Sequence, residues 1–483
     1  MPLGALVAGV DSSTQATKVV VVDPDSGRLV AQGQARHTVT GSDGARESDP
    51  REWWAALRDA LAATGRAGDV GAIAVAGQQH GLVVLDRDGL PLRDATLWND
   101  TRPAEDAERL TEHLGAATWA RLTGLRPVAS FTVCKWAWLR RTEPDLARAV
   151  AAIRLPHDYL TGRLTGRGTT DRGDASGTGW WSPTTGRYLE EILGLPEVDL
   201  SSERLPAILG PTEPAGPISV VAAGELGLAP GTLVGPGTGD NMAAALGLGL
   251  SVGQAAMSLG TSGTIYAVSD RPAADSTGIV AGFADATGRF LPLAATLNCT
   301  VAVDRVAGWL GLDRDDVAPD GEVVMLPYLD GERTPNLPLA SGTIRGLRHT
   351  TTPQQILMAA YEGAVASLLV AFDAIGEAVG GLDPGAPLLL IGGGARGRTW
   401  RSVVSRLTGR AIQVPEAGEL VAIGAAVQAT AVLRGEAPGT VAARWGGASG
   451  TLLEPVSVDE ERLARIGELL ADVTAQQRGL RTG

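Results

Sequence analysis

The fold is decided by two stretches, Asp11-Ser12-Ser13-Thr14-Gln15-Ala16-Thr17-Lys18 and Leu259-Gly260-Thr261-Ser262-Gly263-Thr264. Each is a short turn of small hydroxyl and glycine residues between two runs rich in β-formers, residues 7–10 and 19–22 in the first case. Such turns present successive backbone N–H groups and hydroxyls, which suit phosphate oxygens. One copy alone would indicate an ordinary hairpin. Two copies, one in each half of the chain, predict a two-lobed protein that holds the phosphate tail of a nucleotide from both sides.

Composition indicates a globular protein of more than one domain. With 483 residues the chain is too long for one compact core, and its 44% hydrophobic and 20% charged residues are ordinary proportions. The Pro/Gly-rich segment 230–239 precedes a helix start at Asp240, so we predict two domains, 1–238 and 239–483. The formal net charge of -13 argues against a nucleic-acid partner.

The sequence carries no signal for a membrane or an oxidising compartment. The apolar start of the chain lacks a basic segment before Asp11, and no apolar run reaches 18 residues, so we expect neither a signal peptide nor a membrane partner. Cys134 and Cys299 lie far apart, which favours neither a disulfide framework nor a zinc site. A cytoplasmic protein is the expectation, and association into a homodimer is left open.

Local signals predict an α/β fold. Asp49 can cap a helix that starts with proline, and residues 70–77 have the pattern of a buried strand. In the second half we predict a helix over 353–379, a strand at 388–391 and a last helix after a capping box at 457–460.

A glycine-rich loop follows the predicted strand at 388–391. Gly392, Gly394 and Gly397 match the pattern G-x-G-x-x-G, and Glu416 lies at the distance that a dinucleotide-binding fingerprint requires. Taken alone, this pattern favours an NAD(P)-dependent oxidoreductase, but it leaves both hydroxyl-rich turns unexplained. We therefore favour a loop that lets a nucleotide approach the backbone at a helix N-terminus.

Polar residues at two predicted element boundaries are candidates for chemistry. Asp240 could simply cap a helix, or it could be the general base that phosphoryl transfer to an alcohol requires. Gln79 and His80 follow strand 70–77, at the end where open α/β sheets bind ligands, although a buried structural histidine is the plainer alternative. Lys18 is one of only two lysines and lies in the first turn, either solvated or beside a phosphate.

The ordered set of motifs resembles the FGGY carbohydrate kinases and, within that family, the xylulokinases most closely. The resemblance covers about residues 6 to 430, and the motifs that carry it are the Asp11 turn, Ala76-Gly77-Gln78-Gln79-His80-Gly81, Leu97-Trp98-Asn99-Asp100, Gly239-Asp240-Asn241, Leu259-Gly260-Thr261-Ser262-Gly263, Gly331-Glu332-Arg333-Thr334-Pro335 and Ile391-Gly392-Gly393-Gly394-Ala395-Arg396. Each motif alone is modest, whereas the ordered set is highly specific.

The resemblance implies the actin/hexokinase/Hsp70-like (ribonuclease H-like) fold, with two lobes, each a mixed sheet flanked by helices, and a cleft between them. It implies a phosphotransferase that uses ATP and Mg²⁺ to phosphorylate the 5-hydroxyl of a small-molecule sugar, D-xylulose. Asp240 would be the catalytic base, and Gln79, His80, Asp240 and Asn241 would contact the substrate. Asp11 and Asp240 would lie near the metal, through water. The expected ATP-binding set, which Lys18 joins on its position in the first turn, is Asp11, Ser13, Thr14, Lys18, Gly260, Thr261, Gly393, Gly394 and Ala395.

Two departures from the family pattern bear on these expectations. Gln79 stands where xylulokinases usually have Met, which either alters packing on the sugar or leaves a backbone contact unchanged. Ser13 stands where the broader family often has Gly, so the first turn must avoid a positive φ there.

Two alternative functions are considered. The first is another FGGY kinase, such as a ribulokinase, a gluconokinase or another ketose or polyol kinase. The second is a non-catalytic ATP-binding relative, such as an Hsp70-like lobe or a sugar-responsive repressor. We expect neither of the non-catalytic forms, because no helix-turn-helix segment precedes residue 6 and no peptide-binding domain follows residue 483.

Overall fold

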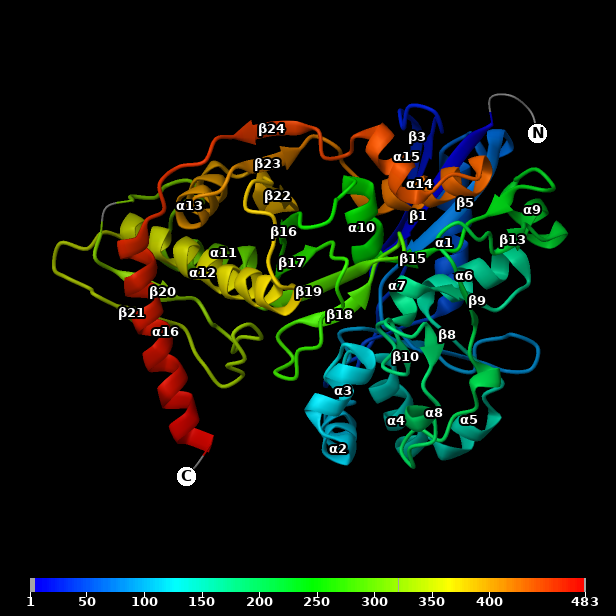
Figure 1. Ribbon diagram of the computed structural model, residues 1–483, viewed down its shortest axis with the longest axis horizontal. Coiled ribbons are helices and arrows are strands. Elements are labelled where there is room, and N and C mark those ends of the chain that lie inside the picture. The colour runs from blue at the N-terminus through cyan, green and yellow to red at the C-terminus, as the bar shows by residue number, and fades with distance from the viewer. Residues whose placement is uncertain (1–4, 320, 482–483) are drawn as a thin grey trace.

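Two seven-stranded sheets, one in each lobe, organise the computed structural model, which describes residues 5–319 and 321–481 (Figure 1). The first sheet has the order β13-β14-β5-β1-β2-β3, with β15 also paired to β5, and the second has the order β18-β19-β17-β16-β22-β23-β24. The strands of the first sheet are β1 (Leu6–Ser12), β2 (Ala16–Val22), β3 (Leu29–Arg36), β5 (Val70–Gly77), β13 (Gly216–Pro217), β14 (Leu233–Val234) and β15 (Thr238–Gly239). Those of the second are β16 (Ala255–Leu259), β17 (Gly263–Ala267), β18 (Ala281–Ala284), β19 (Phe290–Thr296), β22 (Leu388–Ile391), β23 (Ile412–Pro415) and β24 (Gly450–Leu453). The predicted two-lobed α/β fold with mixed sheets is confirmed.

The same strand arrangement occurs in both lobes. Strands β1, β2 and β3 form an antiparallel meander, and β5 then pairs in parallel with β1. Strands β16, β17 and β19 form the equivalent antiparallel set, with β18 added at its outer edge, and β22 pairs in parallel with β16. Each hydroxyl-rich turn therefore connects the first two strands of its lobe, as the repeated sequence pattern predicts.

Helices cover both faces of the first sheet. On one face α1 (Pro50–Ala63) and α6 (Pro156–Thr165) pack against alternate residues such as Val10. On the other face lies α14 (Leu420–Arg434), and a Cβ on Gly9 would come within 1.9 Å of the Ala422 carbonyl oxygen. This close approach requires glycine. Because α14 comes from late in the chain yet packs on the first sheet, the domain division at residues 238 and 239 stays a prediction.

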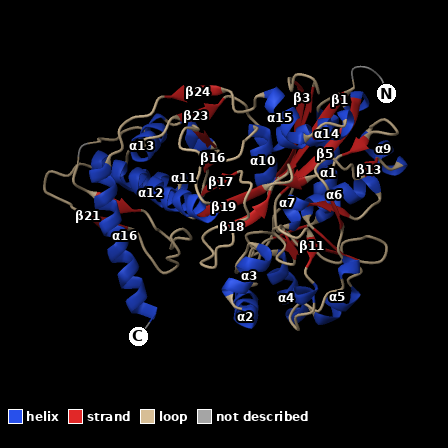
Figure 2. Ribbon diagram, in the orientation of Figure 1, coloured by secondary structure: helices blue, strands red, loops and turns tan. Residues whose placement is uncertain are grey.

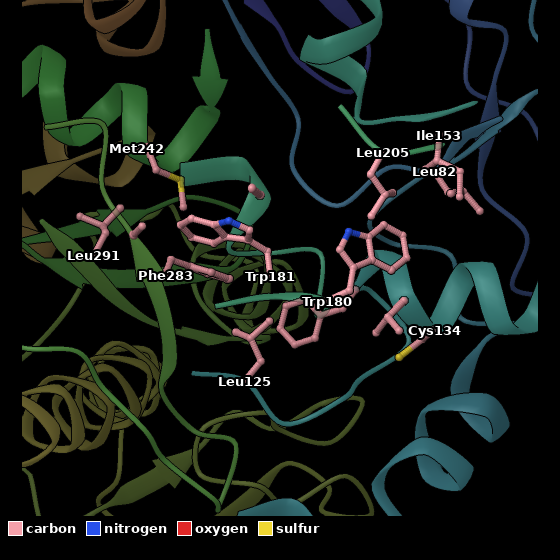
Figure 3. Packing of buried hydrophobic residues seen from close by; sticks show 14 of the residues in the cluster. Leu82, Leu125, Cys134, Ile153, Trp180, Trp181, Leu205, Met242, Phe283 and Leu291 are labelled. Carbon is pink, nitrogen blue, oxygen red and sulfur yellow. The ribbon is translucent and has the colours of Figure 1, made fainter. Parts of the chain in front are cut away.

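The second sheet has a helical layer on each face. One layer consists of α11 (Thr300–Leu310), α12 (Pro353–Val379) and α13 (Arg398–Thr408). The other contains α10 (Asp240–Leu248) and α15 (Pro438–Trp445), which lie between the two sheets. Figure 3 shows this inter-lobe core, in which Trp181 lies beside Met242 of α10 and Phe283 of β18. Hydrophobic burial therefore joins the two lobes next to the start of α10.

Helix α12 has the length and composition of a membrane-crossing segment. However, 72% of its apolar window is buried inside the structure. The core helices of soluble proteins have the same character, so this helix is weak evidence for a membrane span.

The remaining elements are mostly short and lie outside the two large sheets, α2, α3, α4 and α5 beneath the first lobe and α16 at the far side of the second (Figure 2). They are β4 (Glu47–Ser48), η1 (Ala67–Asp69), β6 (Val83–Leu85), β7 (Ala95–Thr96), α2 (Ala104–Leu114), α3 (Ala116–Thr123), α4 (Thr132–Thr142), α5 (Pro144–Ala149), β8 (Ala152–Arg154), β9 (Thr169–Asp171), α7 (Arg172–Ala175), β10 (Trp181–Ser182), β11 (Arg187–Tyr188), α8 (Glu190–Leu193), η2 (Ser202–Arg204), β12 (Ala207–Leu209), α9 (Val220–Leu226), β20 (Val324–Leu326), β21 (Thr343–Arg345), η3 (Gly393–Arg396) and α16 (Glu460–Arg481). The last helix is capped by Asp459, which accepts a hydrogen bond from the Arg462 N–H, and not by Ser457 as the sequence predicts.

Candidate active site

Three parallel strands of the first lobe end at one edge of the sheet. Ser12 of β1 and Gly239 of β15 both pair with Gly77, the last residue of β5. The chain continues from β5 into Gln78-Gln79-His80 and from β15 into Asp240, while Asp11 is the penultimate residue of β1. This register brings Asp11, Gln79, His80 and Asp240 to the carboxyl edge of the sheet, where open α/β sheets bind ligands.

Two carboxylates share this edge. Burial raises the pKa of Asp11 to about 7, with Lys18 lowering it and Glu419 raising it further. Burial, followed by the negative charge of Asp11, raises the pKa of half-buried Asp240 to about 7. Such a pKa poises a carboxylate to take up and release a proton near neutrality.

Asp240 does not cap the helix that it begins. The cap position of α10 is Gly239, which makes no side-chain capping bond. Asp240 Oδ1 instead accepts hydrogen bonds from the backbone N–H of Asn241 at 2.8 Å and from its Nδ2 at 2.9 Å. The plain capping alternative for Asp240 is therefore wrong, and its carboxylate remains at the strand edge.

Gln79 acts through its side-chain amide. Its Oε1 accepts a hydrogen bond from Asn241 Nδ2 at 2.9 Å, so the amide fixes the neighbour of Asp240. A Cβ on Gly239 would lie 2.6 Å from Gln79 Cγ, which shows that the glutamine lies along the backbone before Asp240. Methionine could fill this space but could not accept the Asn241 hydrogen bond.

His80 is held between aromatic rings from both lobes. Its ring meets Phe131 edge-on at 5.1 Å between centroids, and Phe283 of β18 at 5.4 Å. Burial lowers the pKa of His80 to about 3, and the positive charges of Lys135 and Arg333 contribute. The imidazole is therefore neutral near pH 7 and can both donate and accept hydrogen bonds. Its φ of 65° is a strained conformation of the kind found at functional sites.

Buried polar atoms without partners gather at the same edge. Within the described residues they include both amide atoms of Gln78, together with Gln79 Nε2, His80 Nδ1, Asp11 Oδ1 and Asn99 Oδ1. Each such group costs about 1–3 kcal/mol when it is left unsatisfied. A polar ligand bound at this edge would satisfy them.

The first turn is closed by its own backbone and tied to its surroundings. The Ser13 N–H and Oγ both donate to the Ala16 carbonyl, and the φ of Ser13 is not positive, as its sequence requires. Thr14 Oγ1 accepts from Trp98 Nε1 at 3.1 Å. Lys18 lies opposite Asp11 in the hairpin and forms an ion pair of 2.7 Å with Glu419. Lys18 is thus close to the turn but already has an anionic partner.

The second turn lies against the glycine-rich loop. The Gly260 carbonyl accepts hydrogen bonds from both the N–H and the Oγ1 of Thr300, at 3.1 and 2.8 Å. A Cβ on Gly392 would lie 2.7 Å from the Leu259 carbonyl oxygen, so the loop packs directly beside the turn. This places Gly393, Gly394 and Ala395 next to Gly260 and Thr261.

Exposed Gly393 borders open space. Beyond its chain neighbours, no described atom lies within 4 Å of the position a Cβ would take there. Gly393 is therefore accessible from outside the folded chain. The loop also lies inside a meander-type sheet and leads through η3 to α13, which is not the first βα unit of a dinucleotide-binding fold.

The donor set fits Mg²⁺ that is held together with a nucleotide. Among the described residues, no group of three or more His, Cys, Asp or Glu side chains could hold a metal ion. Asp11 and Asp240 supply two interacting carboxylates, and Asp11 Oδ1 is buried without a partner in the described part of the chain. Mg²⁺ in phosphoryl-transfer sites is bound by one or two carboxylates plus phosphate oxygens and water.

Several residues at the site carry no recognisable local signal in the sequence. Phe131 and Phe283 hold His80, and the nearby hydroxyl of buried Tyr266 has no partner among the described residues. Arg333 lies close enough to His80 for its charge to lower that pKa. Its loop is anchored by buried Glu332, whose carboxylate accepts the N–H groups of Leu297, Asn298 and Arg333. The motif around Arg333 points to the family, but its role at the site comes from the structure.

Comparisons with known proteins agree with this geometry. The family models for the N-terminal and C-terminal domains of the FGGY family of carbohydrate kinases match residues 6–247 and 255–433. The xylulose kinases of Streptomyces rubiginosus and Streptomyces coelicolor are 60% and 59% identical over 471 residues, which cover 97% of this chain and 96% of each relative. The crystal structure of xylulose kinase from Bifidobacterium adolescentis has a TM-score of 0.84 at 37% identity and covers 97% of this chain and 100% of that one. The expected actin/hexokinase-like fold is thereby confirmed, and the chain belongs to the FGGY family of carbohydrate kinases.

Proposed function

We propose that this chain is an ATP-dependent kinase that phosphorylates D-xylulose on its 5-hydroxyl. The observation that carries the proposal is the position of Asp240. Asp240 lies at the same strand edge as Gln79 and His80, is joined to Gln79 through the Asn241 side chain, and begins α10. Burial and the charge of Asp11 raise the pKa of its carboxylate to about 7. The 60% identity to a xylulose kinase over nearly the whole chain supports the choice of sugar.

In the proposed reaction, Asp240 accepts the proton of the sugar hydroxyl as its oxygen bonds to the γ-phosphorus of ATP. The bond from that phosphorus to the bridging oxygen breaks, and ADP leaves. Neutral His80 and the Asn241 side chain orient the sugar by hydrogen bonds. Phe131 and Phe283 exclude water from the imidazole side of the site.

The two turns, together with the metal, bind the phosphates of ATP in the proposed complex. Asp11 and Asp240 would hold Mg²⁺, which supplies neutralisation of the phosphate charge when it is bound. Thr14 and Thr261 contact the phosphates through backbone N–H groups and hydroxyls. Ser13 and Gly260 hold the two turns in shape around the phosphates, because their own N–H groups donate to backbone carbonyls within the turns. Gly393, Gly394 and Ala395 border the adenosine. Lys18 adds positive charge if it exchanges Glu419 for a phosphate.

The direct test is ADP release by the purified protein with D-xylulose, L-ribulose, D-gluconate, glycerol and L-xylulose. We expect the highest kcat/KM for D-xylulose. A higher value for another sugar would overturn the choice of substrate and leave the kinase assignment in place. If the protein released no ADP with any of the five sugars, the enzymatic function itself would be overturned and a non-catalytic relative would be favoured.

The proposed reaction also suggests where the protein works and what it contacts. A soluble sugar and ATP meet in the cytoplasm, so we place the protein there, with a sugar as its partner and no membrane or nucleic acid. Size-exclusion chromatography with light scattering will distinguish a monomer from a homodimer.

A further inference from the structure

Four ionisable residues are buried beneath the strand edge that carries Asp240. His157 and Asp158 begin α6, Asp171 ends β9, and Asp174 lies in α7. His157, Asp158 and Asp174 have no exposed surface, and Asp171 has 4%. His157 Nδ1 donates to Asp174 Oδ2 at 2.8 Å, and its Nε2 lies 3.2 Å from Asp158 Oδ1. The histidine is therefore hydrogen-bonded to one carboxylate and lies within ion-pair distance of a second in the interior of the first lobe.

This network packs directly against the backbone of the strand ends. A Cβ on Gly77, the last residue of β5, would lie 3.0 Å from His157 Cβ. A Cβ on Gly237, just before β15, would lie 2.5 Å from His157 Cδ2. The two segments that lead into the site thus rest on His157, most tightly at Gly237, whose φ of 77° also favours glycine.

One hydrogen bond connects the network to the strand that ends next to the base. Thr238 Oγ1 donates to Asp171 Oδ2 at 2.7 Å, and Thr238 precedes Asp240 by two residues. Asp171 is itself fixed by the N–H groups of Gly173 and Asp174. From α14, on the opposite face of the sheet, Gln428 Nε2 donates to the Gly237 carbonyl at 3.0 Å. The short strand β15 is therefore held from both faces.

The same network reaches the other half of the site through α7. Ser176, which ends α7, accepts a hydrogen bond at its Oγ from the Ala284 N–H of the second lobe at 2.9 Å. A Cβ on Gly177 would come within 2.4 Å of His80 Nδ1. The backbone around α7 thus touches the His80 ring and the strand that carries Phe283.

Such a network stabilises a protein core less than apolar residues of the same volume would. Burial raises the pKa of Asp174 to about 7. Burial lowers the pKa of His157, but Asp158, Asp174 and Asp171 together outweigh it and raise this pKa to about 9. Charged groups buried in this way usually contribute less to stability than apolar residues of the same volume. A function that needs exact geometry offsets this cost, because hydrogen bonds fix direction as well as distance.

We propose that the His157–Asp158–Asp171–Asp174 network positions Asp240 for proton transfer, with the Thr238–Asp171 hydrogen bond as its connection to the base. The inference rests on the proposed kinase function. These residues are positioning residues: they set the direction of β15 and hence of the Asp240 carboxylate. Asp240 then lies in line with the sugar hydroxyl in a larger fraction of encounters.

The test compares two isosteric changes, one in β15 and one just before β14 of the same sheet. Thr238→Val removes the hydroxyl that binds Asp171, while Asp171 keeps its two backbone donors. The matched control is Thr232→Val, because buried Thr232 donates to the Val70 carbonyl at the opposite end of β5. Both variants, with Thr238→Ser as the conservative rescue, are measured for kcat, for KM of both substrates and for Tm. If Thr238→Val is not recovered folded, Thr238→Ala replaces it.

We expect Thr238→Val to lower kcat by about 10- to 100-fold with little change in either KM, as small misplacements of catalytic groups do. Thr232→Val should lower Tm and leave kcat near the wild-type value, and Thr238→Ser should restore kcat. Equal kcat in the two valine variants, or no rescue by serine, would overturn the inference while the wild-type activity upholds the kinase. A wild-type protein without turnover on any sugar would overturn both.

Discussion

The two hydroxyl-rich turns occupy equivalent places in two similar sheets, yet they differ in chemistry. The first turn follows buried Asp11 and is tied to Trp98 and, through Lys18, to Glu419. The second offers backbone groups and hydroxyls, and the open space over Gly393 lies beside it. The two lobes thus repeat one strand arrangement, but only the first turn has charged side chains around it. The first turn belongs to the lobe that carries the proposed base, so phosphate chemistry and sugar binding share one set of strand ends.

Among changes within the two turns, Asp11→Asn should have the largest effect. It removes a buried charge that we place beside the metal and phosphates, so kcat should fall by about 10²- to 10³-fold. Steady-state turnover of ATP with D-xylulose measures this. Asp88→Asn, in an exposed turn of the same lobe, is the control for the same chemical change and should be neutral. A kcat for Asp11→Asn close to that of the control would place the important charge elsewhere.

Gly393→Ala tests the loop beside the second turn. The added methyl meets no described atom beyond its chain neighbours within 4 Å, so Tm should be unchanged. In the proposed complex the methyl meets the nucleotide, which should raise KM for ATP about tenfold through overpacking. Gly68→Ala, also in open space, controls for the loss of glycine flexibility. An unchanged KM for ATP in Gly393→Ala would contradict the proposal that adenosine binds at this loop.

Lys18 should have a smaller effect because it already has a partner. Its ion pair with Glu419 is about one-third exposed on each side, 33% and 35%, and contributes at most about 1 kcal/mol to stability. If Lys18 moves to a phosphate, Lys18→Met should raise KM for ATP severalfold, whereas Glu419→Gln should not raise it. Titration of ATP into both variants distinguishes the roles, and equal losses in the two would assign Lys18 to the ion pair alone.

In the ligand-free protein, Asp11 and Asp240 should contribute a loss of stability as the pH rises from about 4 to about 7, while His80, with its lowered pKa, contributes in the opposite direction. The pKa values of Asp11 and Asp240 are raised from 3.8 to about 7, so the folded chain binds these protons more tightly than the unfolded chain does. The contribution of these two carboxylates to the free energy of unfolding therefore falls across this interval. Thermal unfolding at pH 5 and pH 8 in metal-free buffer checks this, and Asp240→Asn should show a smaller decrease in Tm. A decrease as large as in the wild type would mean that Asp240 titrates normally in the folded protein.

Much of the fold could be predicted because its signals are local. The helix over 353–379 and the strand at 388–391 match α12 and β22, since a capping residue, a proline and a glycine mark their ends. The capping box at 457–460 was misplaced because Ser457 and Asp459 both precede the helix, and only the folded chain decides which one faces its first N–H groups.

The site could be predicted only where its residues lie in recognisable motifs. Gln79, His80 and Asp240 follow strands, and their meeting point is set by the parallel register of β1, β5 and β15. Phe283 and Arg333 approach His80 from the other lobe. Thr238 donates a hydrogen bond to Asp171, which lies 67 residues earlier in the sequence. Such contacts depend on tertiary packing, which local sequence patterns do not encode.

The most direct measurement compares wild type and Asp240→Asn for both catalysis and nucleotide binding. Initial rates of ADP formation with D-xylulose give kcat, and calorimetric titration gives the Kd for ATP. Loss of a general base should lower kcat by about 10²- to 10⁴-fold, while the turns and the glycine-rich loop still bind ATP as in the wild type. Turnover by Asp240→Asn at the wild-type rate would contradict the assignment of Asp240 as the base.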